Sequence, residues 1–315
     1  MSFHIARYKR ELSVASAYLA LLVVLALAAP RFFQVEFRDT WVNIAPMLVV
    51  AIGMTLVIVA RQIDISVGSQ FSICAVTAGL LARMGMPMPM VIVATIVAGM
   101  AMGAMNGALV AGLGLPSIVV TLATMVIFRQ SLTWARQGAM VADLPSRFQW
   151  FGQSQRMGEW LIVDISIAIF MAFAWAAGWL SAGRKVYAVG SDEEAARLSG
   201  IRPGRVVFGV FVLMGALVGV AALLQSVRFA EVDPGTGNGM ELEAIAAVVV
   251  GGAAISGGRG TMVGSFIGVA LLGTIGAAMV FLARQAQWDK AIEGAIILTA
   301  VASDGFAGRR RKGVA

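Results

Sequence analysis

Long apolar runs separated by short charged segments dominate the sequence. A helix needs about 20 mostly apolar residues to cross the ~30 Å hydrocarbon core of a membrane. Runs of this kind predict spans at 12–30, 41–60, 65–82, 160–182, 206–227 and 260–283. The uncharged run 84–128 is too long for one helix, and the segment GLGLP divides it into spans near 88–110 and 116–135. Ala286–Ser303 and the shorter run Ala244–Gly258 bring the predicted total to ten.

The first apolar run has two interpretations. MSFHIARYKR is basic and Ala-Leu-Ala at 26–28 resembles a cleavage site, so the segment imitates a signal peptide. Leu12–Ala29, however, exceeds the usual apolar length of about 7–15 residues in such peptides, and many further spans follow. We therefore interpret it as an uncleaved first span.

The charges of the loops predict an orientation. Basic residues lie before the first span, in the loop 184–205 and in the segment RRRK at 309–312. The loop 184–205 holds five basic residues, whereas the loop 228–243 holds only Arg228. Cytoplasmic loops are enriched in Lys and Arg, so we expect both termini and the loop 184–205 in the cytoplasm. This arrangement requires an even number of spans, as ten is, and places the loops 136–159 and 228–243 outside.

The composition supports an integral membrane protein with little soluble mass. Hydrophobic residues make up 59% and charged residues 13% of the chain, with a mean hydropathy of +0.85, against about 45–50% and ~25% in soluble domains. The net charge of +7 does not indicate nucleic acid, since no basic face with interleaved aromatic residues is present. We expect an all-α protein with one transmembrane domain over 1–315, a cytoplasmic loop 183–205 and a basic tail 305–315.

The cysteine and histidine content excludes several kinds of site. Cys74 and His4 are each the only residue of their type. An intrachain disulfide, a histidine-based metal site and a histidine-based catalytic triad are therefore not expected. The sequence shows no nucleophile–base pair, which argues against an intramembrane enzyme. We expect no metal and no cofactor bound by this chain.

Glycines recur at every fourth position in several spans. They are Gly99, Gly103 and Gly107, then Gly215 and Gly219, then Gly260, Gly264 and Gly268. This spacing lets two helix backbones approach closely in lipid. The segment GGAAISGGRGTMVGSFIG (251–268) has neither the P-loop pattern nor the dinucleotide-binding spacing. We interpret it as a tight turn between glycine-packed helices, not as a nucleotide site.

The segment ARQIDISVGSQ (60–70) places Arg61 and Asp64 between two apolar runs. Ionisable residues near membrane depth are costly and suggest a function. Alternatively, Asp64 caps the following helix, since Asp is a favoured N-cap residue. Asp164 and Glu293 are similar single acids near helix ends. The absence of a convincing acid at mid-span argues against a proton-coupled carrier.

The charged loop GRKVYAVGSDEEAARLSGIRPGR (183–205) predicts a short helix. Ser191 or Asp192 can cap it, and Glu193 and Glu194 fall in its first turn, where the helix dipole favours negative charge. Gly200 can end it, and Pro203 prevents its continuation. A solvated surface helix between two spans is the alternative without a specific function.

Within this loop, Glu194-Ala195-Ala196 followed by Gly200 resembles the coupling motif E-A-A-x-x-x-G of ABC importer permeases. Four longer segments resemble permeases of the ribose type, and the likeness runs from about Asn43 to Asp304. These segments are GMTLVIVARQIDISVGS (53–69), LPSIVVTLATMVIFR (115–129), GRKVYAVGSDEEAARLSGI (183–201) and GMELEAIAAVVVGGAAISGGRGTMVGSFIG (239–268). RQIDISVGS and WDKAIEGAIILTAVASDG are most similar to the rhamnose and autoinducer-2 branches. Arg61-Gln62 stands where many members carry Gly-Gly, which leaves the substrate open.

The resemblance implies a bundle of ten helices arranged like the vitamin B12 permease, in the bacterial inner membrane. It also implies a second permease subunit, identical or related, a periplasmic sugar-binding protein and an ATP-binding subunit that holds ATP and Mg. Glu194, Ala195, Ala196, Arg197 and Gly200 would form the helix that docks on the ATP-binding subunit. Asp64 and Gly68 belong to the family-motif turn.

We therefore expect the membrane-spanning subunit of an ATP-driven importer for a monosaccharide or sugar-like solute. Ser69, Gln70, Asn106 and Gln225 are candidates for the substrate path, because uncharged hydrogen-bonding side chains suit hydroxyl-rich molecules. Arg184, Arg197 and Arg205 can contact acidic groups or the phosphates of membrane lipid, and nucleic acid is not an expected partner. The alternative is a self-sufficient secondary transporter or channel for a small polar solute.

Overall fold

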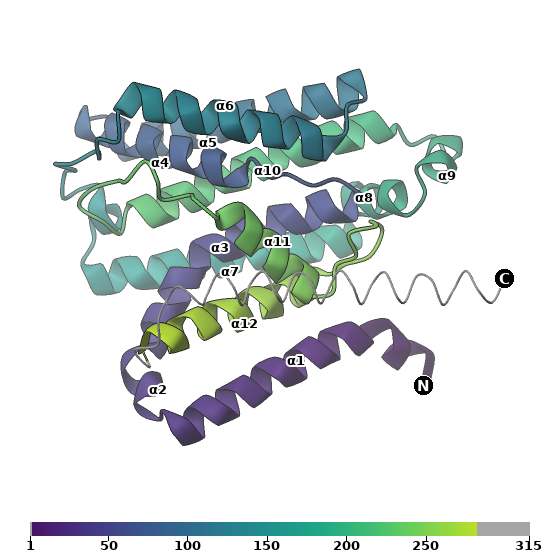
Figure 1. Ribbon diagram of the computed structural model, residues 1–315, viewed down its shortest axis with the longest axis horizontal. Coiled ribbons are helices and arrows are strands. Elements are labelled where there is room, and N and C mark those ends of the chain that lie inside the picture. Colours follow the sequence, from purple (N-terminus) through teal and green to yellow (C-terminus); the bar gives the residue numbers. More distant parts are fainter. Residues whose placement is uncertain (1, 282–315) are drawn as a thin grey trace.

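The bundle is built around one buried helix, α3 (Phe37–Val59). A computed structural model describes residues 2–281, with their side chains from residue 11 onward. From Ile44 onward α3 is apolar on all its faces, which is the pattern of a helix surrounded by others. It packs against α7 (Gln155–Trp179), α10 (Pro203–Ser226), α11 (Met240–Val250) and α12 (Met262–Phe281) and runs through the middle of the molecule (Figure 1). α3 is thus the axis around which the other helices are arranged.

Seven of the described helices are long and apolar enough to cross a membrane. Besides α3 these are α1 (Ser2–Ala28), α5 (Met88–Gly107) with its π-helical extension η1 (Ala108–Gly112), α6 (Ser117–Arg136), α7 (Gln155–Trp179), α10 (Pro203–Ser226) and α12 (Met262–Phe281). The shorter helices are α2 (Arg31–Val35), α4 (Val67–Arg83), α8 (Ser181–Ser191), α9 (Glu193–Leu198), α11 (Met240–Val250) and the 3-10 turn η2 (Gln149–Gly152). The predicted all-α class is confirmed for the described residues, whose strand-like pairing is limited to the bridge between Val141 and Val232.

Seven of the ten predicted spans correspond to these long helices. The span predicted at 65–82 is α4, which has 17 residues. The span predicted at 244–258 is wrong, because α11 ends at Val250 and a loop follows over 251–261. Gly252 adopts φ +99 there, a left-handed conformation that suits glycine and breaks the helix. The predicted span 286–303 and the tail 305–315 lie outside the described residues.

The loops gather at two ends of the bundle as their charges predicted. The N-terminal end of α1 lies at the same end as α8 and α9 (Figure 1). At the opposite end, Val141 and Val232 exchange two backbone hydrogen bonds of 2.9 and 3.0 Å, which join the loops 137–154 and 227–239. The side of the membrane on which each end lies remains a prediction from the basic residues.

The glycine stripes of α5 and α10 face each other. A Cβ atom on Gly99 would lie 2.1 Å from the carbonyl oxygen of Gly215, and one on Gly103 would lie 2.2 Å from that of Phe211. A second contact of this kind joins α12 to α11, since a Cβ atom on Gly268 would lie 2.0 Å from the carbonyl oxygen of Ala247. These contacts confirm close helix packing by the glycines on α5, α10 and α12, whereas Gly260 lies outside the helix, in the loop 251–261.

Substituting Gly215→Ala is expected to lower the free energy of unfolding by about 1–3 kcal/mol, because the added methyl group forces α5 and α10 apart. Gly178→Ala on α7 is the matched control, since a Cβ atom added there would have open space within 4 Å. Thermal unfolding of the two detergent-solubilised variants measures the difference. Equal melting temperatures would show that the α5–α10 contact is not tight.

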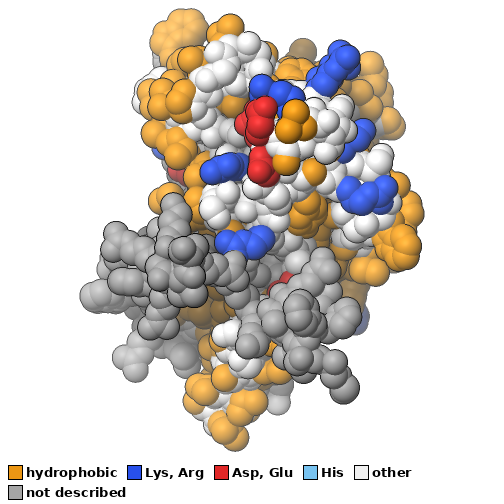
Figure 2. Space-filling view, turned by 90° about the vertical axis from the view of Figure 1, so that its right-hand side faces the viewer, with side chains coloured by type: hydrophobic (Ala, Val, Ile, Leu, Met, Phe, Trp, Pro, Cys, Tyr) orange, Lys and Arg blue, Asp and Glu red, His pale blue; other side chains and the backbone are white. Residues whose placement is uncertain are grey.

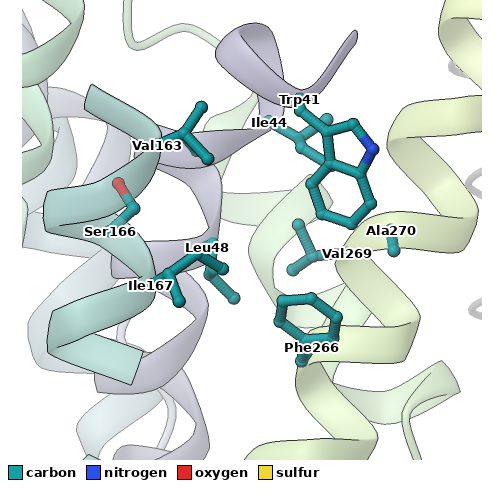
Figure 3. Close-up of a pocket in the computed structure, with 10 residues that line it drawn as sticks. Trp41, Ile44, Leu48, Val163, Ser166, Ile167, Phe266, Val269 and Ala270 are labelled. Carbon is teal, nitrogen blue, oxygen red and sulfur yellow. The ribbon is translucent and has the colours of Figure 1, made fainter. Parts of the chain in front are cut away.

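The core between α3, α7 and α12 is almost filled. Its cavity has a volume of about 10 Å³, room for about one water molecule. Trp41 and Phe266 stack across it, with ring centroids 5.9 Å apart and an interplanar angle of 26° (Figure 3). A monosaccharide does not fit this cavity.

Candidate functional site

The predicted helix in the charged loop is present as α9. Asp192 is its N-cap, and its Oδ1 accepts hydrogen bonds of 3.0 Å from the backbone N–H groups of Glu194 and Ala195. Asp192 has extended backbone angles, which separate α9 from α8. Gly200 follows the helix with φ +81, a conformation that favours glycine. Of the two predicted caps, Asp192 is therefore correct.

α9 presents most of its side chains to solvent. The side chains of Glu194 and Arg197 are 71% and 60% exposed, and Leu198 is 83% exposed. Ala196 instead is buried and packs with Val189, Val207 and Phe211, which anchors the helix to the bundle. Figure 2 looks at this end, where acidic, basic and hydrophobic side chains lie next to one another.

Leu198 was missed by the sequence reasoning. It directly follows Arg197, in a loop that the sequence marks chiefly by its charges.

α8 lies directly on the end of α3 and on the loop 251–261. A Cβ atom on Gly190 would lie 1.7 Å from the carbonyl oxygen of Val59, at the end of α3, and 2.8 Å from the nitrogen of Gly258. The carbonyl of Val59 also accepts a 2.9 Å hydrogen bond from Gly258. We call these three residues the glycine junction. The hydroxyl of Tyr187 adds a 2.8 Å bond to the carbonyl of Gly260.

The glycine junction confirms the interpretation of the glycine-rich segment as a tight turn. Gly257, Gly258 and Gly260 all have positive φ angles, and the turn lies between α11 and α12. α8 is joined to α9 through Asp192, and its residues Tyr187 and Gly190 contact the end of α3 and the turn 251–261.

The segment between α3 and α4 leaves the helical conformation and is held by a buried carboxylate. Asp64 is fully buried and accepts bonds from the N–H of Ser66 (2.9 Å), its hydroxyl (2.6 Å) and Nε2 of Gln70 (3.3 Å). Asp64 is not the N-cap of α4, because the helix begins at Val67 and Ser66 is its N-cap. In place of the predicted cap, Asp64 accepts a hydrogen bond from the backbone N–H of Ser66, two residues on, which is a contact of the kind that fixes turns.

Three of the four candidate path residues lie at this turn. Gln70 and Asn106 both donate to the hydroxyl oxygen of Ser66, at 2.7 and 2.8 Å, and Ser69 donates to its carbonyl at 2.8 Å. All three are buried. The side-chain carbonyl oxygens of Gln70 and Asn106 have no hydrogen-bond partner in the described part of the chain.

The fourth candidate, Gln225, is separate from this cluster. Its Oε1 accepts a 3.0 Å hydrogen bond from Arg228 at the end of α10. The structure therefore groups Ser69, Gln70 and Asn106 around Ser66 and places Gln225 apart.

The N-terminal ends of α4 and α11 meet inside the bundle. A Cβ atom on Gly68 would lie 2.3 Å from the carbonyl oxygen of Gly237 and 2.2 Å from Oε2 of Glu241. The N–H of Gly237 donates a 3.1 Å bond to the hydroxyl of Ser72 on α4. Gly68 is thus required by a close approach of the two chain segments. Interrupted helices whose ends meet in this way form the substrate sites of many transporters.

An ion pair that the sequence reasoning missed lies beside this meeting point. Nη2 of Arg129 on α6 is 3.5 Å from Oε1 of Glu241, whose side chain is 9% exposed. Nε of Arg129 and Oε2 of Glu241 have no hydrogen-bond partner among the residues that the structure describes. The available signal was Arg129 itself, an ionisable residue inside the predicted span 116–135.

Comparison with known proteins places the chain in a family. The family described as "Branched-chain amino acid transport system / permease component" matches residues 38–301. The chain is 32% identical over 297 residues to the autoinducer 2 import system permease protein LsrC of Enterobacter sp. (strain 638), covering 94% of this chain and 87% of that protein. It is 31% identical over 303 residues to the protein of the same name from Photorhabdus luminescens, covering 94% and 90%.

No solved structure matches the chain. The family match includes α9, the two interrupted helices α4 and α11, and all four segments that resemble ribose-type permeases. Its members are transport permease subunits, which are not themselves enzymes. The chain therefore belongs to this family of transport-system permease components, the ABC importer permeases that its motifs resemble, as a multi-pass protein of the bacterial inner membrane.

Proposed function

We propose that this chain carries a monosaccharide or a sugar-like solute of the autoinducer-2 kind through the membrane, driven by a partner ATPase. The observation that carries the proposal is α9, a capped helix with an exposed charged and apolar surface, in a chain similar to autoinducer 2 import permeases. The energy comes from ATP and Mg bound by the partner subunit, and this chain binds no cofactor. A periplasmic sugar-binding protein delivers the solute at the opposite end.

The coupling step follows from the glycine junction. The ATP-binding subunit docks on Glu194, Ala195, Arg197 and Leu198, while Ala196 and Gly200 set the shape of the helix. α8 transmits the displacement of α9 to the end of α3 and to the turn 251–261. Since α4 follows α3 and α11 precedes that turn, both interrupted helices move with the junction. In a pair of permease subunits, identical or related, this movement produces alternating access.

The path runs along the face of α6 and α11 that carries Arg129. The side chain of Arg129 is 35% exposed within a membrane-spanning helix. A guanidinium group is unstable against lipid and faces a protein interior or a water-filled cavity instead. This face of α6 therefore turns toward the second permease subunit, and Arg129 and Glu241 supply the donors and acceptors for sugar hydroxyls. Ser69, Gln70 and Asn106 join the path when α4 and α11 separate.

Reconstitution in liposomes tests the proposal. We expect uptake of labelled autoinducer 2, rhamnose or ribose only when the ATP-binding subunit, the binding protein and ATP are all present. A non-hydrolysable ATP analogue is the matched control and should abolish uptake. Uptake by this chain alone under an ion gradient would identify a secondary transporter or channel and would contradict the proposal. Differently tagged copies that purify together would identify a homodimer.

A further inference from the structure

A groove opens between α7, α8 and α10 near the end of the bundle that carries α9. Its volume is about 380 Å³, within the range of about 300–1,000 Å³ for sites that bind small molecules. Its wall is apolar and includes Leu56, Phe173, Val206, Val210 and Leu213. Hydroxyl groups buried against such a wall would lose their hydrogen bonds, so the groove does not suit a sugar.

Two basic residues lie at this groove, Lys185 on α8 and Arg205 on α10. Both are exposed, and no carboxylate forms an ion pair with either among the described residues. An apolar wall with two unpaired cations matches a molecule that has a hydrocarbon chain and an anionic head.

The groove lies at the level of the lipid headgroups. Trp175 and Trp179, in the last turns of α7, are 57% and 74% exposed, and Trp is enriched where membrane helices meet the interface. The wall is formed by the membrane-spanning helices α3, α7 and α10 together with α8, which follows α7 and carries Lys185. A lipid molecule therefore reaches the apolar wall with its chain and the cations with its phosphate.

We propose that this groove binds an anionic phospholipid of the cytoplasmic leaflet, with an acyl chain against α7 and α10 and its phosphate between Lys185 and Arg205. The leaflet follows from the predicted orientation. α8 forms one wall of the groove and leads into α9, so the lipid steadies the base of the coupling helix. The binding site is independent of which solute the protein carries.

Lipid binding to the purified full-length permease tests this site. The protein is delipidated in detergent and titrated with phosphatidylglycerol or phosphatidylcholine, and bound lipid is counted by native mass spectrometry. We expect a preference for phosphatidylglycerol that falls at least fivefold in the double variant Lys185→Gln/Arg205→Gln. Arg202→Gln is the matched control, since Arg202 is exposed nearby but does not line the groove.

A second variant tests the acyl-chain part of the site. Gly209 lines the groove, and a Cβ atom added to it would meet no other atom within 4 Å, so Gly209→Leu fills the groove without changing the charge. We expect it to lose the bound lipid. Binding that survives this change and is displaced by glycerol 3-phosphate would identify a site for free anions and overturn the proposal.

Photo-crosslinking of the unaltered protein does not depend on the folding of any variant. Phosphatidylglycerol with a diazirine in its acyl chain should label peptides of α7 and α10. Uniform labelling of all lipid-facing helices, or equal phosphatidylglycerol retention in the double variant and Arg202→Gln, would contradict the proposal.

Discussion

Glu194→Arg is expected to lower ATP-dependent uptake at least about tenfold, equivalent to about 1.4 kcal/mol, while the permease stays folded. The Glu194 side chain is 71% exposed and lies 3.9 Å from Arg197. Loss of the Glu194 carboxylate costs α9 about 0.3–1 kcal/mol of stability, because the helix dipole favours negative charge in the first turn. Loss of the exposed ion pair with Arg197 adds little to this cost. The larger effect comes from the interface, because a reversed charge against a docked partner costs several kcal/mol.

Co-purification separates this effect from a folding defect. The Glu194→Arg permease should elute normally by size exclusion but recover less ATP-binding subunit and stimulate less ATPase activity. Glu231→Arg is the matched control, since Glu231 is also exposed and acidic but lies at the opposite end of the bundle. Intact recovery of the ATPase with Glu194→Arg, together with normal uptake, would show that α9 is not the docking helix.

The sequence predicted α9 well because its determinants are local. Asp192, the acids of the first turn and Gly200 lie within nine residues, and each acts on the backbone of its own neighbours. The long spans were predictable for a similar reason, since each needs only enough apolar residues to satisfy the membrane. The glycine stripes predicted close packing, but which stripe meets which depends on the tertiary arrangement.

The interrupted helices were not predictable from the same pattern. Residues in a membrane protein's interior are apolar whether they form a helix or a turn, so the run 244–258 looked like one span. Its two halves, a helix to Val250 and a turn beyond it, differ in the four glycines and the one serine of the second half. The polar residues of 60–70 did suggest a break after α3, but not that α4 begins beside α11.

The ion pair between Arg129 and Glu241 joins residues 112 positions apart. The sequence around each residue does not identify the other as its partner, because α6 and α11 come together only in the folded protein. The loop charges predicted Glu241 in an outer loop, whereas the structure buries it in the first turn of α11. Arg129 was the better clue, since a lone arginine in a span requires a partner.

Removing one partner of this pair is expected to have the second large effect. Arg129→Leu leaves Glu241 buried without its counter-ion, and breaking a buried pair in this way costs about 3–5 kcal/mol. Glu241→Gln keeps the shape of the side chain beside Gly68 and leaves Arg129, which is 35% exposed, to find other acceptors. We therefore expect a much lower melting temperature for Arg129→Leu than for Glu241→Gln.

The double variant Arg129→Leu/Glu241→Gln distinguishes a structural pair from a substrate site. It contains no unpaired charge, so most of the stability lost in Arg129→Leu should return. If the pair only holds α6 against α11, uptake returns with stability. We expect instead that uptake stays low in the stable double variant, because the donors and acceptors for the sugar are missing. Uptake that recovers in parallel with the melting temperature would remove Arg129 and Glu241 from the path.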